Sequence, residues 1–71
     1  MRNYHVTLTR ENEDRAINDV HYYVILAVDN EKAAAENAMR RAVSDYPGDD
    51  IGFQSCRETR TREPKENYTL N

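Results

Sequence analysis

The chain has 71 residues, 32% of them charged, and its ten basic and thirteen acidic side chains leave a net charge of −3. A chain of this length forms one domain that buries only about 60% of the surface its unfolded form exposes, so there is no room for a deep active-site cleft. The negative charge argues against a protein whose affinity comes from neutralising nucleic-acid phosphates.

The only cysteine, Cys56, cannot form an internal disulfide bond. Small secreted domains usually depend on several disulfides to compensate for a thin core. The first ten residues contain no apolar signal core, and no stretch of the chain is apolar for long enough to span a membrane. We therefore expect a cytoplasmic protein without membrane contact.

Residues 3–10 alternate between an apolar and a polar face, with Tyr4, Val6 and Leu8 on the first and His5, Thr7 and Thr9 on the second. This alternation, with its aromatic and β-branched side chains, predicts a half-buried strand. Residues 11–19 are mostly polar and contain four acidic side chains. They predict a long hairpin loop rather than a tight turn.

Residues 20–28 predict a second strand that is apolar on both faces. We assign Tyr22, Val24 and Leu26 to the core face. Asp29 or Asn30 is expected to cap a helix by accepting a backbone hydrogen bond. The helix then presents an apolar stripe at helical spacing, formed by Ala35, Ala38, Met39, Ala42, Val43 and Tyr46.

Pro47 and Gly48 end the helix in a turn, and residues 51–57 predict a third strand. Ile51 and Phe53 should face the core, and Gln54 and Cys56 the other side. We expect the domain to cover residues 1–58. The polar tail, residues 59–71, is expected to be partly ordered at most, with residues 59–62 extending the third strand or forming a short fourth edge strand.

The order β-β-α-β predicts an α+β fold, in which one helix packs on one face of a three-stranded sheet. The right-handed crossover makes the second and third strands run in the same direction. Either the first or the second strand can occupy the centre. The expected core comprises Tyr4, Val6, Leu8, Tyr22, Val24, Leu26, Ala35, Ala38, Met39, Ala42, Val43, Ile51 and Phe53.

One helix cannot cover both faces of a sheet, so the second face is expected to be open. We predict that this open face carries a mixture of apolar and aromatic side chains, to which Ala27 and Cys56 also belong. The residues of this face that we expect to bind a partner are His5, Thr7, His21, Tyr23, Ile25 and Gln54. The partner is another protein or, in a homodimer, a second copy of the chain.

Catalytic chemistry has little support in the sequence. His5, His21 and Cys56 are residue types that bind zinc, but their spacing matches no zinc pattern. Cys56 lacks an identifiable base to activate it as a nucleophile. We therefore predict a non-enzymatic protein with no catalytic residue, metal or cofactor.

Two other uses of the surface stay open. A nucleic-acid-binding regulator would use a basic strip formed by Arg40, Arg41, Arg57, Arg60 and Arg62. Alternatively, the carboxylates of residues 11–19 and 45–50 could mimic phosphates and occupy the basic channel of a protein partner.

The run from Tyr22 to Ala38, in which a strand ends in Asp29-Asn30 and opens an alanine-rich helix, resembles very small phage and prophage proteins, including some anti-CRISPR inhibitors. The resemblance covers residues 3–57 as a pattern of elements and carries over no binding residue. It implies an inhibitory or accessory protein that occludes a surface of a host protein complex in the host-cell cytoplasm. The basic residues of the tail depart from a purely acidic mimic.

Overall fold

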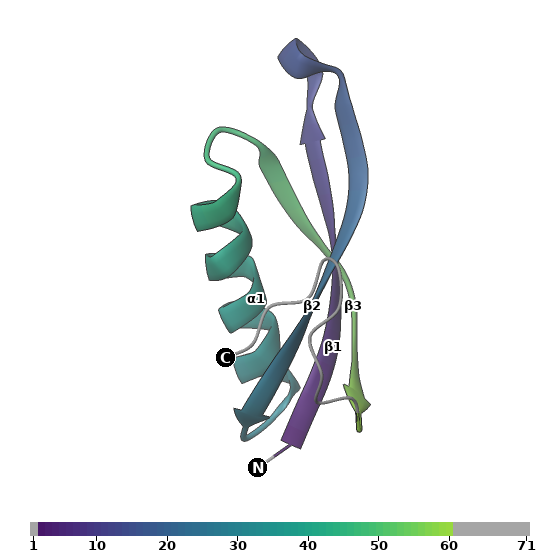
Figure 1. Ribbon diagram of the computed structural model, residues 1–71, viewed down its shortest axis with the longest axis vertical. Helices are drawn as coiled ribbons and strands as arrows, with labels where there is room; N and C mark the ends of the chain where they lie inside the picture. The colour runs from purple at the N-terminus through teal and green to yellow at the C-terminus, as the bar shows by residue number, and fades with distance from the viewer. Residues whose placement is uncertain (1, 61–71) are drawn as a thin grey trace.

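The computed structural model describes residues 2–60 and confirms the α+β fold in the order β-β-α-β. Its elements are β1 (Arg2–Asn12), the 3₁₀ helix η1 (Glu13–Arg15), β2 (Ile17–Val28), α1 (Glu31–Asp45) and β3 (Asp50–Thr59). In Figure 1, α1 lies along one side of a strongly twisted sheet. Predictions for residues 61–71, including Arg62, lie outside the described residues.

The strand order is β2-β1-β3, which places β1 in the centre. Both neighbours are antiparallel to β1, so β2 and β3 run in the same direction, as predicted. The connection through α1 therefore skips one strand. Of the two strand orders that the sequence left open, the structure has the one with the first strand in the middle.

The β1–β2 hairpin is longer and its loop shorter than predicted. Both strands continue into the polar segment, and only residues 13–16 connect them. The Asn12 side chain accepts a hydrogen bond from the Arg15 backbone N–H at 3.2 Å, and Ala16 closes the turn with a left-handed φ of 54°. This end of the hairpin extends past α1 (Figure 1). Because the helix does not cover it, the strands can carry polar side chains there.

Whether this short loop has an even or an odd number of residues decides which face of β2 meets the helix. Asn12 pairs with Ile17, so even residues of β1 lie opposite odd residues of β2. Val6 is therefore opposite Tyr23, and Tyr4 is opposite Ile25. The prediction that assigned Tyr22, Val24 and Leu26 to the helix-covered core was wrong, because both faces of β2 are apolar and the pattern alone does not distinguish them.

Two bulges shift the register further along the strands. In β2, Ala27 has a φ of 58° and donates its backbone N–H to Asn3 Oδ1 at 3.1 Å, and the shift brings Val28 onto the core. In β3, Gln54 is the extra residue, after which Cys56 lies opposite Val6. Cys56 therefore packs on the helix side, and its predicted position on the open face was wrong.

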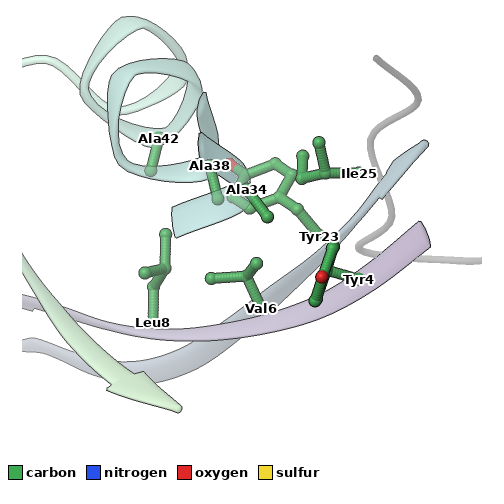
Figure 2. Packing of buried hydrophobic residues seen from close by; sticks show 8 residues of the cluster. All are labelled: Tyr4, Val6, Leu8, Tyr23, Ile25, Ala34, Ala38 and Ala42. Carbon is green, nitrogen blue, oxygen red and sulfur yellow. The ribbon is translucent and has the colours of Figure 1, made fainter. Parts of the chain in front are cut away.

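The core lies between the sheet and α1 (Figure 2). Its buried members are Tyr4, Val6, Leu8, Tyr23, Ile25, Ala34, Ala38 and Ala42, and Val28, Met39, Ile51 and Cys56 pack against them. Side chains from β1 point at the three alanines in Figure 2. Because these alanines are small, the helix backbone lies close to the sheet.

The buried line of α1 differs from the predicted stripe. It runs through Ala34 in place of Ala35, which is half-buried, and the Val43 side chain is 57% exposed. Phe53, also predicted to be in the core, is 53% exposed at the β3 bulge. The predicted cap is confirmed, since Asn30 Oδ1 accepts the Ala33 backbone N–H at 2.9 Å.

Candidate functional site

The sheet face opposite α1 is built from cross-strand rows, each centred on an odd residue of β1. The three rows nearest the hairpin end form the surface we call the distal face. Its members are Asn18, Glu11 and Asp50 in the first row, Val20, Thr9 and Gly52 in the second, and Tyr22, Thr7 and Ser55 in the third. Most of these side chains are exposed.

The next row toward the strand ends is different. Val24 lies on this face opposite His5, yet its exposed fraction is 0% and it stands outside the helix-side core. The His5 ring stacks on Tyr22, with 5.0 Å between ring centroids. Burial and the positive charge of Arg57 lower the pKa of His5. In this row Val24 is therefore inaccessible, whereas Arg57 on β3 is exposed.

The structure divides the predicted partner-binding residues. His5 and Thr7 lie on the face opposite α1, as predicted, and Gln54 is exposed at the bulge. Tyr23 and Ile25 were wrongly placed there: they lie beneath α1, with exposed fractions of 4% and 0%. His21 is also on the helix side, opposite Leu8, and Ala27 takes part in the β2 bulge.

Val20 is the distal-face residue that the sequence reasoning missed. Its side chain is 55% exposed, and it lies opposite Thr9. On the other side of Thr9, a Cβ atom at Gly52 would come within 2.6 Å of Thr9 Oγ1. The absence of a side chain at position 52 leaves the space that the Thr9 side chain occupies against the neighbouring strand.

A network on the helix side holds the α1–β3 turn against the hairpin. The Arg10 guanidinium lies 3.9 Å from the centroid of the Tyr46 ring, and that ring also contacts His21, at a centroid distance of 4.9 Å. The Tyr46 hydroxyl lies 3.4 Å from His21 Nδ1. Tyr46 is thus held between residues of two strands, and the turn that follows it is fixed in place.

Asp49 anchors the same turn. It accepts a hydrogen bond from Asn12 Nδ2 at 2.6 Å and forms an ion pair with Arg10, and its side chain is only 1% exposed. The hydrogen bond from Asn12, followed by that from Arg10, lowers the pKa of Asp49. The charged carboxylate is therefore the form that the folded state stabilises.

We expect the Asp49 contribution to stability to disappear in acid. A carboxyl group whose folded-state pKa is depressed stabilises the fold above its unfolded pKa of about 3.9 and loses that effect as the pH falls through the folded value. Thermal unfolding of wild type and Asp49→Asn should therefore differ at neutral pH and converge below about pH 4. Asp29→Asn, at an exposed carboxylate, is the control and should not converge in this way. A constant difference between wild type and Asp49→Asn down to pH 2.5 would contradict this prediction.

Charge is concentrated at the projecting end of the hairpin. The acidic hairpin end consists of five exposed carboxylates accompanied by the single cation Arg15: Glu11, Glu13, Asp14, Asp19 and Asp50. This group carries −4, so the remainder of the chain carries +1 of the total of −3. Within residues 2–60 the ion pairs are Arg2–Glu58, Arg10–Asp49 and Arg41–Asp45, and none of them involves these carboxylates.

Between residues 2 and 60, the structure does not bring the basic residues of the predicted nucleic-acid strip together. Arg40 and Arg41 lie on α1, and Arg41 is 3.5 Å from Asp45 in an ion pair. Asp45 also accepts a hydrogen bond from the Tyr23 hydroxyl at 3.1 Å. Arg57 lies opposite His5 in the layer away from the helix, and Arg60 follows the end of β3.

Metal and thiol chemistry find little support in the part of the chain that the structure describes. No group of three or more potential ligand side chains is placed to hold a metal ion there. Burial and the nearby Glu31 carboxylate raise the pKa of Cys56, which disfavours the thiolate that a nucleophile needs. Between residues 2 and 60, no helix has the length and apolar content needed to cross a bilayer.

Comparison of the chain with protein-family models, with curated proteins and with solved structures gave no match. The function must therefore be argued from the surface itself.

Proposed function

We propose that this chain is a non-enzymatic accessory protein of phage or mobile-element origin, which binds a host protein complex in the cytoplasm and occludes one of its surfaces. The origin rests on the layout shared with very small phage proteins. The binding role rests on one observation: Val20 is more than half exposed on a sheet face that α1 does not cover.

The composition of the distal face supports this role. Protein interfaces commonly have an apolar centre with a polar rim. Here Val20 lies beside Thr9, Gly52 lies on the other side of Thr9, and the rows above and below carry Glu11 and Ser55. A surface with short side chains at its centre allows a partner to approach closely without ordering long, flexible side chains.

We do not put forward nucleic-acid binding as a second function. Among the described residues of the strip, Arg40 and Arg41 lie on α1 and Arg57 on the opposite sheet face, and Arg41 is already paired with Asp45. A basic strip requires cations that lie along one surface.

We expect Val20→Asp to abolish recovery of the host partner in affinity purification from the native host. A charge placed at an apolar contact of an interface is desolvated without a counterion, which is costly. Val43→Asp is the matched control, because Val43 is 57% exposed and Val20 55%, but Val43 lies on α1. Circular dichroism should show both variants folded.

Partner recovery that survives Val20→Asp, or that is lost equally in Val43→Asp, would contradict the proposal. Light scattering of the purified protein tests the homodimer that we also expected on this face. If the wild type is a dimer and Val20→Asp a monomer, the occupant of the distal face is a second copy of the chain, and the host-partner proposal fails.

A further inference from the structure

The exposed apolar residue of the distal face, Val20, lies on the edge strand β2, and the outermost row of this face is acidic. Glu11 lies directly opposite Asp50 on one side and Asn18 on the other. Like charges that face each other across neighbouring strands destabilise a sheet. Since neither carboxylate takes part in an ion pair within residues 2–60, the described chain leaves this repulsion uncompensated.

Local rules of stability are typically broken where a function requires it. Here the like charges of Glu11 and Asp50 lie opposite each other, and a cation between the two carboxylates would remove their repulsion. The same two carboxylates line a surface hollow with Asn12, Glu13, Asp14 and Gly48. Within residues 2–60, the carboxylates of this hollow are not arranged as a group that could hold a metal ion.

The position of this row is also fixed. Asp50 follows Asp49, which the hydrogen bond from Asn12 and the ion pair with Arg10 hold against the hairpin. The acidic row and the exposed Val20 therefore belong to neighbouring rows of one surface, with Val20 on β2, Glu11 on the central strand β1 and Asp50 on β3.

We propose that the distal face binds a segment of its protein partner that places a lysine or arginine side chain between Glu11 and Asp50 and an apolar side chain on Val20. This inference rests on the proposed protein-binding function and names the chemistry of the partner. It follows from charge complementarity, since the acidic hairpin end carries −4 and the rest of the chain +1. Opposite charge at the rim speeds association and excludes acidic partners.

The test uses the full chain and a short capped peptide in which pairs of lysines alternate with pairs of leucines, so that an extended conformation has both residue types on each face. Titration followed by NMR should move the backbone amide signals of residues 9–11, 18–20 and 50–52 rather than those of α1. The double variant Glu11→Gln/Asp50→Asn should bind about fivefold more weakly at low salt, as expected for two exposed charge pairs. Binding of the wild type should weaken as salt is raised.

The matched control is Glu36→Gln/Asp29→Asn, which makes the same two chemical changes at exposed carboxylates away from the distal face. It should change the affinity by less than about twofold. Glu11→Gln/Asp50→Asn should also raise the thermal midpoint by about 2–4 °C, because it removes the opposed charges. Weaker binding by a more stable protein cannot result from unfolding.

Equal losses in the two double variants would show attraction by net charge alone and would overturn the inference. Equal binding of a peptide with glutamate in place of lysine, or signal changes centred on α1, would overturn it as well. Its failure is separable from that of the proposed function. If the host partner requires Val20 but is recovered equally with Glu11→Gln/Asp50→Asn, the protein-binding role stands and the basic partner segment is excluded.

Discussion

Ile25→Thr is expected to cost about 2–4 kcal/mol of unfolding free energy, because it removes apolar volume from a fully buried site and buries a hydroxyl group. Ile25 has an exposed fraction of 0% beneath α1. A chain of this size has a total stability of about 4–10 kcal/mol, so this one change removes a large part of it. Urea unfolding followed by circular dichroism measures the loss.

Val20→Thr is the matched control for Ile25→Thr. Both changes place the same β-branched residue in β2, so the intrinsic strand preference is nearly unchanged. Val20 lies on the opposite face and is 55% exposed, and its replacement should alter stability by no more than about 0.5 kcal/mol. Similar costs at the two positions would contradict the assignment of the β2 faces.

The second large effect is expected from overfilling the contact between α1 and the sheet. Ala38 is fully buried at the middle of the alanine line that faces Leu8 and Val6 (Figure 2). Ala38→Leu adds three carbon atoms where the backbones lie close together, and should cost about 1–3 kcal/mol as the helix is pushed outward. Thermal and urea unfolding both measure this loss.

Ala33→Leu provides the comparison, because Ala33 is on the same helix but only half-buried, outside the core. Alanine and leucine have similar helix propensities, so the two variants differ mainly in packing. Ala33→Leu should stay within about 0.5 kcal/mol of the wild type. If Ala38→Leu were equally harmless, the core would have unfilled space beside the alanines.

The element order was predictable because each element has a local signal. Alternation identified β1, and Asn30 followed by the alanine-rich run identified the start of α1. The assignment of faces was not predictable in the same way, since β2 is apolar on both sides and its orientation depends on the residue count of the loop. The Asn12 side chain and the left-handed Ala16 define that count, and neither is obvious in a polar stretch.

The candidate site was predictable only in part for the same reason. His5 and Thr7 follow from the alternation of β1, which the structure preserves. Tyr23 and Ile25 were misplaced with the whole of β2, and Val20 was missed with them. The bulge at Gln54 then reversed the side of Cys56, because an extra residue in one strand depends on tertiary pairing rather than on local sequence.

The length of the four-residue connection at residues 13–16 affects how the surface of this protein can evolve. Adding or removing one residue there would exchange the face of β2 that packs against α1 with the face that points away from it, since both faces are apolar enough to be buried. Tyr22 and Val24 would then face α1, and Tyr23 and Ile25 would face away from it. A one-residue insertion or deletion in this loop would thus change which side chains lie on the uncovered face of the sheet, while the order of the elements is retained.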